Sequence, residues 1–362
     1  MLEGILIVSR NMSAANRKIF SNLIEFLSAN GVQVRGADEI RYIKSNAPEK
    51  KTIKYLKIQY REKLARSMEF AIGKLQSKFF LIILGPSVLE ENISDIFEFV
   101  SMDAGWFTTI TSEMDVDIAP GISAYEVADA LNDRYRNAPS PYDGHHFSDI
   151  SHFFNPVTVF AISSTSPFNE NDFYRIVGTF LCARQELLNL DIPQNLIKDY
   201  EKLFMEGPDN LPFEELLDSL TSLRWKDAFL DVYRCIERLF PYSYVHSLHA
   251  KTATTTPLEE LIKIVEDVLG WNPKEDLAID TIFSTCGHSE ESLLRNVKKK
   301  IFGTEKGGIG VELVYKLRNS IVHHRLRGNR IHKNIEIIDW VSIIKGLLIV
   351  MRNEYLKYYG SI

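Results

Sequence analysis

From Asn171 onward the sequence shows helical periodicity and no strand pattern, and this feature constrains the fold most. Apolar residues recur there at intervals of three and four, which places them on one face of an α-helix. We therefore predict that the second half of the chain is an all-α helical bundle. Its helices are predicted at residues 171–190, 194–204, 213–223, 225–240, 257–269, 289–302, 309–324 and 335–358.

The first half alternates short apolar runs with helical segments. Strands are predicted at residues 5–8, 32–35, 79–84, 106–110 and 157–162, and helices at 13–30, 41–78 and 89–101. Continuous apolar runs are typical of buried parallel strands, and their alternation with helices indicates an α/β fold. We predict an α/β sensor or regulatory domain with an open, mostly parallel sheet over residues 1–205, and a helical domain over 206–362.

The composition is that of an ordinary soluble protein in a reducing compartment. The three cysteines are far apart and odd in number, which suits neither a disulfide framework nor a zinc site of paired cysteines. The first residues lack the basic region of a signal peptide, and no run approaches the ~18 apolar residues of a membrane span. We predict a cytoplasmic protein that contacts no membrane and requires no cofactor and no metal.

The predicted helix at residues 309–324 indicates a function most directly. One arc of its helical wheel is apolar and consists of Leu313, Val314, Leu317 and Ile321. Arg318, Asn319 and His323 fall on the opposite side. A guanidinium can offset the charge of a phosphate, and an imidazole titrates near neutral pH. These groups are the smallest set that could cleave RNA without a metal ion.

The sequence Arg318-Asn319-x-x-x-His323 resembles the R-x4–6-H signature of HEPN domains, in the variant with a polar residue after the arginine. The resemblance implies a homodimer whose two motifs meet in one active site. It also implies a metal-independent endoribonuclease that leaves a 2′,3′-cyclic phosphate and a 5′-hydroxyl. Arg318 would hold the scissile phosphate, His323 would act as general acid or base, and Asn319 would orient the imidazole or bind a phosphate oxygen. His324 is the alternative catalytic histidine, at R-x5-H spacing.

The resemblance also implies a biological setting, because HEPN proteins are common in toxin and antiviral-defence systems. RNA is then the expected substrate, and an inhibitory or activating partner or a small-molecule ligand is a further expectation. Two alternatives stay open at this point. The bundle could be a non-enzymatic dimerisation module beside a ligand-binding α/β domain, or the first domain could process a nucleotide with the bundle as its scaffold.

Two basic clusters are candidates for contacts with the RNA backbone. The formal net charge of −6 makes binding through the whole surface unfavourable, so a local patch is required. The cluster nearest the motif consists of Arg325, Arg327 and Arg330. The second is the basic segment 41–78, in which Tyr55 and Tyr60 are interleaved; a solvated helix face explains it equally well.

Small polar residues follow the predicted strands of the first domain. In an open parallel sheet, ligands bind outside the carboxyl ends of the strands. Ser9, Arg10, Asn11 and Ser87 are placed there, which predicts a site for an anionic or nucleotide ligand. The chain contains neither GxGxxG nor GxxxxGK[ST], so neither a dinucleotide fingerprint nor a P-loop is present. Glu113, Asp115 and Asp117 alternate and would share one face of a strand, where an exposed edge explains them as easily as Mg²⁺.

Overall fold

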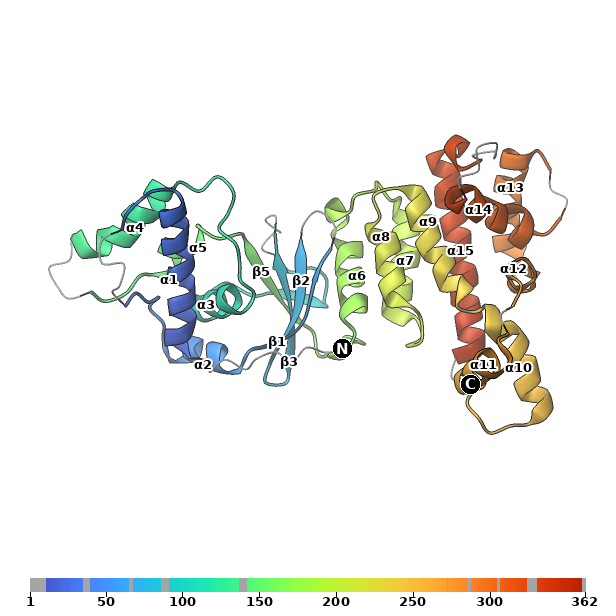
Figure 1. Ribbon diagram of the computed structural model, residues 1–362, viewed down its shortest axis with the longest axis horizontal. Coiled ribbons are helices and arrows are strands. Elements are labelled where there is room, and N and C mark those ends of the chain that lie inside the picture. Colours follow the sequence, from blue (N-terminus) through green and yellow to red (C-terminus); the bar gives the residue numbers. More distant parts are fainter. Residues whose placement is uncertain are drawn as a thin grey trace. The chain divides into compact units, whose positions relative to one another are not determined.

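The computed structural model describes residues 11–34, 40–64, 68–85, 91–136, 142–271, 273–284, 288–304, 307–323 and 331–359 (Figure 1). Contacts divide the chain into two compact units, Met1–Phe173 and Tyr174–Ile362, called here the N-terminal and C-terminal units. This division lies earlier in the chain than the expected boundary at 205. Arg175 shows why, since its guanidinium donates to the carbonyl oxygens of Phe204 and Met205, both at 2.9 Å, and so joins two helices of the second unit.

The N-terminal unit contains one five-stranded sheet in the order β1-β2-β3-β5-β4, and every pairing in it is antiparallel. The strands are β1 (Lys57–Lys63), β2 (Glu69–Leu75), β3 (Lys78–Leu84), β4 (Phe97–Phe99) and β5 (Val157–Ile162). The prediction of an open, mostly parallel sheet is therefore wrong. Leu75 pairs with Lys78, so only two residues connect β2 to β3. A connection this short can join antiparallel strands only.

The physical reason for the error lies in the burial of the central strands. In β3 every residue from 80 to 84 is buried, although successive side chains point to opposite faces of the sheet. An antiparallel strand that is covered on both faces therefore has the same continuous apolar run as a parallel one. The runs predicted at 79–84 and 157–162 are confirmed as strands, but their pattern does not reveal strand direction.

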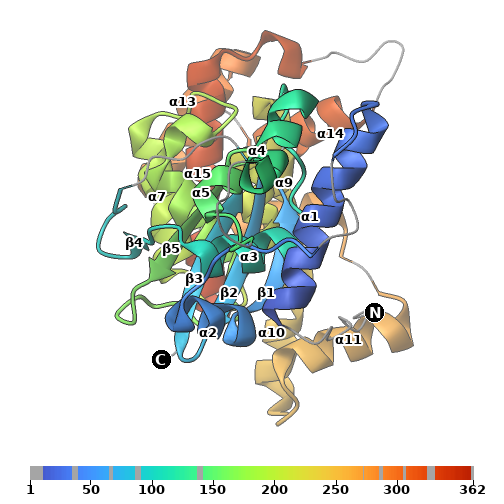
Figure 2. The ribbon, with the colours of Figure 1, turned by 90° about the vertical axis from the view of Figure 1, so that its left-hand side faces the viewer.

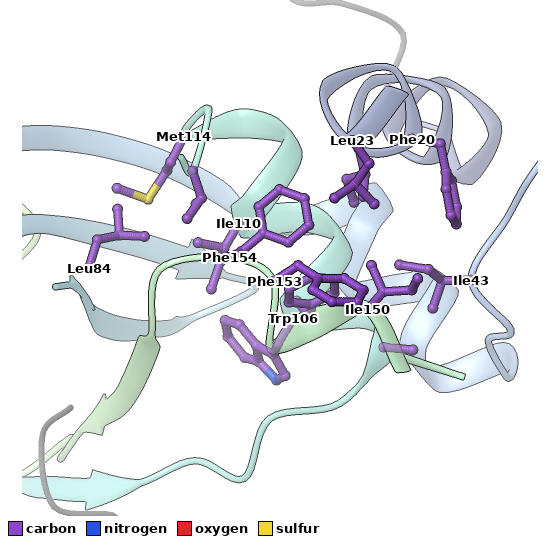
Figure 3. Close-up of a cluster of buried hydrophobic side chains, with 14 of the residues drawn as sticks. Phe20, Leu23, Ile43, Leu84, Trp106, Ile110, Met114, Ile150, Phe153 and Phe154 are labelled. Carbon is purple, nitrogen blue, oxygen red and sulfur yellow. The ribbon is translucent and has the colours of Figure 1, made fainter. Parts of the chain in front are cut away.

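Helices cover one face of this sheet (Figure 2). They are α1 (Met12–Ala29), α2 (Ala47–Tyr55), α3 (Ala104–Glu113), α4 (Ala124–Arg136) and α5 (Phe147–Ser151). Figure 3 shows the core between them, where Leu23 of α1, Ile110 of α3 and Leu84 of β3 contribute to one buried cluster. Burial of this cluster stabilises the unit, at roughly 25 cal/mol for each Å² of apolar surface removed from water.

Helix α3 occupies residues that were predicted as a strand at 106–110, and this prediction is wrong. Asp103 begins the helix, because its carboxylate accepts hydrogen bonds from the backbone N–H groups of Gly105 and Trp106 at 2.8 and 2.9 Å. All residues from 104 to 112 are buried. A helix that is buried all round has no apolar stripe, so its sequence lacks the helical period.

Three further predictions in this unit are corrected. The segment 41–78 is not one helix, because it contains α2, β1 and β2. The described part of the predicted helix 89–101 contains β4, and residues 32–34 form no strand. The predicted strand at 5–8 lies outside the described residues.

The C-terminal unit contains helices and no strand in the part of the chain that the structure describes, as predicted from residue 171 onward. The long closing helix α15 packs against α7, α9 and α13. Two helices, α10 and α12, were not predicted. The elements are α6 (Phe173–Ala183), η2 (Gln185–Leu187), α7 (Gln194–Glu206), α8 (Phe213–Thr221), α9 (Trp225–Glu237), α10 (Phe240–Thr252), α11 (Leu258–Leu269), α12 (Glu275–Ser284), α13 (His288–Phe302), η3 (Gly310–Tyr315), α14 (Lys316–Val322), η4 (Ile331–Asn334) and α15 (Ile337–Tyr359). Among the described residues, no helix is both long and apolar enough to cross a membrane.

Gly105 permits the close packing of α3 against α2, and Gly105→Ala is expected to destabilise the N-terminal unit. A Cβ atom at this position would lie 2.5 Å from the backbone oxygen of Glu49, so one backbone must move. We expect a loss of about 1–3 kcal/mol in the free energy of unfolding, measured by urea denaturation. Ser21→Ala, at an exposed position of α1, is the control. An increase in stability by the ~1 kcal/mol with which alanine favours a helix over glycine would contradict this packing.

Candidate functional site

The segment that contains the RNxxxH motif is a π-helical turn, η3, which continues into α14. Its apolar stripe is buried as the wheel predicts, through Leu313, Val314, Leu317 and Ile321. Gly310 begins the segment and lets it approach α12, because a Cβ there would lie 2.7 Å from the backbone oxygen of Ile279. The ammonium of Lys298 donates to the carbonyl oxygen of Gly307 at 2.8 Å just before the helix. These contacts determine where the opposite, polar face of the helix lies.

Arg318 projects from this polar face into a group of side chains from two other helices. Its Nη2 atom lies 3.2 Å from Glu275 Oε1 on α12 and 3.8 Å from Glu237 Oε1 on α9. The guanidinium carbon lies 5.7 Å from the centre of the Tyr233 ring, also on α9. The Arg318 side chain is only 21% exposed. It is therefore a positioned cation, more strongly fixed than an arginine on a solvated helix face.

Tyr233 connects the parts of this group. Its hydroxyl donates a hydrogen bond of 2.7 Å to Glu275 Oε1, the same oxygen that faces Arg318. Burial, together with this hydrogen bond, raises the pKa of Tyr233 well above its ordinary value. The hydroxyl therefore stays protonated and remains a donor to Glu275 at physiological pH.

The pKa of Glu237 is higher than that of an ordinary surface glutamate. Burial raises its pKa, the nearby Glu275 carboxylate raises it further, and the positive charge of Arg318 opposes both. Two carboxylates thus face one guanidinium, with Arg234 as a second cation that acts on Glu237. The negative charges of Glu237 and Glu275 largely offset the positive charge of Arg318. A phosphate that approaches Arg318 must therefore compete with these two carboxylates.

Asn319 and His323 complete the motif. Arg318 Nη1 donates to Asn319 Oδ1 at 3.0 Å, which makes Asn319 a neighbour of the guanidinium. His323 caps the carboxyl end of α14, and its backbone N–H donates to the carbonyl oxygen of Asn319 at 3.0 Å. The imidazole is exposed, whereas Arg318 is largely buried. The motif thus presents an accessible titratable group at the end of a helix and a fixed guanidinium about one and a half turns earlier.

A cavity of about 650 Å³ borders this group of side chains. Glu237 and Glu275 belong both to its wall and to the surroundings of Arg318. The apolar residues of its lining are Phe240, Pro241 and Pro273. Its other lining residues are Glu215, Arg234, Arg238 and Glu266. Four glutamates and two arginines line the cavity, so its formal charge is negative and it attracts cationic groups more than phosphate.

Two contributors to the site were not predicted from sequence, namely Glu275 and Tyr233. Glu275 lies at the start of α12, a helix that sequence periodicity did not reveal. Tyr233 lies on α9 one position after the core residue Val232, and no pattern distinguishes it from other aromatic residues. The hydroxyl of Ser320 lies 3.3 Å from Nδ1 of His332, so a second imidazole adjoins the motif helix. Glu237, the second carboxylate beside the motif, lies 3.8 Å from Arg318.

Several residues predicted as site residues lie outside the described residues. These are the alternative catalytic histidine, the RNA-binding cluster and most of the predicted ligand site, namely His324, Arg325, Arg327, Arg330, Ser9, Arg10 and Ser87. Asn11 is described, and it caps α1, because its side-chain oxygen accepts from the backbone N–H of Ala14 at 2.8 Å. Because the sheet is antiparallel and Asn11 caps α1, an anion site at the ends of parallel strands is not supported.

The other charged clusters are dispersed by the fold. In the basic segment 41–78, Lys44 pairs with Asp143 at 2.6 Å, Arg61 pairs with Glu69, and Lys74 pairs with Glu170. The acidic triplet is not on a strand, because Glu113 ends α3 and Asp115 has a positive φ and pairs with Lys18 at 2.5 Å. The described residues contain no group of three or more His, Cys, Asp or Glu side chains placed to bind a metal.

Comparisons with known proteins add no further assignment. No family model matches the chain, and neither a curated protein nor a solved structure is significantly similar to it. The motif and the side chains around it therefore carry the functional information in this chain.

Arg318→Ala is expected to make the stability of the protein more dependent on pH. Without the guanidinium, burial and Glu275 remain to raise the pKa of Glu237. A carboxyl whose folded-state pKa is raised is neutral at low pH, and it costs stability once the pH rises through that pKa. We expect nearly the wild-type Tm at pH 4.5 and a Tm lower by about 2–6 °C at pH 8, measured by calorimetry. Arg224→Ala, which removes an exposed pair with Asp227, is the control and is expected to change Tm little at either pH. An equal deficit at both pH values would contradict the proposed balance.

Proposed function

We propose that this protein is a HEPN-type, metal-independent endoribonuclease that cleaves RNA through Arg318, Asn319 and His323. The observation that supports the proposal most is the contrast within the motif. Arg318 is fixed by Glu275, Glu237 and Tyr233, while His323 remains exposed on the same helix. A solvated helix face would not need an arginine positioned by residues from two other helices.

In the proposed mechanism His323 acts on the ribose. As a general base it takes the proton of the 2′-hydroxyl, which then attacks the adjacent phosphorus; as a general acid it protonates the departing 5′-oxygen. The reference pKa of an imidazole, about 6.5, suits either role near neutral pH. The products are a 2′,3′-cyclic phosphate and a 5′-hydroxyl. When two protomers meet, one imidazole can serve in each role.

Arg318 binds the scissile phosphate in this mechanism. A guanidinium has five N–H donors, and the contacts with Glu275, Glu237 and Asn319 leave donors for phosphate oxygens. Because Arg318 is largely buried, its charge is worth more to a transition state than that of an exposed arginine. Glu275 and Tyr233 hold the guanidinium in place before the substrate arrives, which reduces the cost of ordering it.

A second subunit is part of the proposal, and exposed apolar side chains of the C-terminal unit support it. Val322, next to His323, is 45% exposed. Ile337 and Ile338, at the start of α15, are 62% and 61% exposed. Apolar side chains that are exposed on a monomer are often covered by a partner subunit. The resemblance further suggests a toxin or antiviral effector, which cleaves cellular RNA when it is activated.

Arg318→Ala and His323→Ala are each expected to reduce RNA cleavage at least about 100-fold. The assay uses the purified full-length protein with mixed cellular RNA in the presence of EDTA, and it identifies the cyclic phosphate ends. Arg224→Ala and His246→Ala remove an exposed arginine and an exposed histidine outside the motif and should keep full activity. Wild-type activity in both motif variants would refute the proposed site. Dimerisation of the wild type without any cleavage would favour a non-enzymatic interaction module.

Val322→Asp is expected to weaken dimerisation and to lower cleavage in parallel, because it places a charge in the proposed subunit interface. Sedimentation equilibrium measures the dimer, and we expect its dissociation constant to rise at least about tenfold. Leu223→Asp changes a residue that is 73% exposed and lies before α9, and it serves as the matched control. A wild-type monomer that cleaves RNA, or an unchanged dimer of Val322→Asp, would show that this surface is not the interface.

A further inference from the structure

The N-terminal unit contains a cavity of about 550 Å³ that the proposed ribonuclease does not use. It lies among the residues that follow β4, the helices α3 and α5, and the start of β5. Its lining consists of Phe99, Ser101, Met102, Phe107, Ala119, Phe147, Ser151, His152, Phe154, Asn155, Pro156, Val157 and Thr158. This volume is within the range of pockets that enclose small organic molecules.

Aromatic rings form the apolar part of the cavity. Phe107 packs edge to face against Phe154, with ring centres 5.8 Å apart, and lies 6.5 Å from Phe147. Phe107 and Phe154 are each only 2% exposed, so the fold holds these rings in position before any ligand binds. Met102 adds a polarisable thioether to the same lining. Such a surface favours a flat aromatic ligand, which can pack against the rings.

Small polar side chains form the remainder of the lining. Thr158 is a buried residue of β5, and Ser101, Ser151 and Asn155 add hydroxyl and amide groups. Nδ1 of His152 lies 3.2 Å from the carbonyl oxygen of Ser148. In the neutral ring Nδ1 then donates to that carbonyl, and Nε2 is left as an acceptor. A ligand with both donors and acceptors on its edge can therefore be recognised.

The charge of the lining restricts the ligand further. Among the described residues that line the cavity there is no Asp, Glu, Lys or Arg. Phosphate groups are normally bound by arginine, lysine or several backbone N–H groups, so a nucleotide would leave its charge uncompensated here. This contrasts with the cavity beside Arg318, whose lining contains two arginines and four glutamates.

We propose that this cavity binds an uncharged nucleobase or nucleoside. The flat base would lie against Phe107, Phe147 and Phe154, and its polar edge would meet Thr158, Asn155 and His152. This site lies within the N-terminal unit and does not depend on the ribonuclease proposal. It gives the first unit the role of a small-molecule receptor, with a ligand of different charge from the anion predicted from sequence.

Titration calorimetry of the full-length protein tests the proposal with adenosine, guanosine, cytidine and uridine, each compared with its 5′-monophosphate. We expect at least one nucleoside to bind with a Kd in the range of about 1–100 µM, and its monophosphate to bind at least about tenfold more weakly. If none of the four nucleosides binds at a concentration of about 1 mM, the proposal is overturned. Tighter binding of a monophosphate than of its nucleoside would also overturn it, because the site would then recognise anions.

Ala119→Phe separates specific binding in this cavity from binding elsewhere. Ala119 lines the cavity, and a phenyl group there would fill part of it. We expect at least about a tenfold loss of nucleoside affinity. Ala29→Phe, the same change at an exposed position of α1, should bind as the wild type does. Circular dichroism and a thermal melt report whether the variant is folded. Where Ala119→Phe unfolds the protein, Thr158→Val keeps the side-chain shape, removes the hydroxyl and should weaken binding at least about threefold. Unchanged affinity in a folded Ala119→Phe protein, or in Thr158→Val, would refute the assignment.

Discussion

The ion-pair group around Arg318 is the interaction on which the arrangement of the candidate site depends. It joins three helices that are distant in sequence, since Tyr233 and Glu237 lie on α9, Glu275 on α12 and Arg318 on α14. A largely buried guanidinium is stable only where carboxylates and hydrogen-bond acceptors compensate its lost hydration. The requirement that stabilises the group thus also fixes in one orientation the cation that we propose to bind phosphate.

This arrangement has a consequence for binding of a substrate. The carboxylates that position Arg318 also weaken its attraction for phosphate. The fixed position of the guanidinium is therefore accompanied by a lower affinity for a phosphate group. In the proposed mechanism, differential binding favours such a site, because the guanidinium would interact most strongly when negative charge develops on the phosphate in the transition state. Burial and the Glu275 carboxylate raise the pKa of Glu237, and Arg318 opposes both. The charge of the group around Arg318 therefore depends on pH through Glu237.

The two units differ in the chemistry of their cavities. The cavity beside Arg318 is lined by charged side chains, whereas the one in the N-terminal unit is lined by aromatic and small polar groups. The first lining has four glutamates against two arginines, so phosphate groups are not expected inside that cavity, whereas uncharged aromatic walls suit a neutral aromatic molecule. If both proposals hold, the chain combines a ribonuclease site with a receptor site for a small ligand.

Local sequence determined the helical second unit, the strands at 79–84 and 157–162 and the two-faced motif helix, because periodicity reflects which face of an element is buried. It could not determine the antiparallel sheet or helix α3. An element that is buried on all sides has a continuous apolar run whatever its direction or type. The partners of Arg318 were decided by tertiary structure alone, since Glu275 and Tyr233 approach it through packing of α9, α12 and α14. Contacts between residues so far apart in sequence have no local pattern that could reveal them.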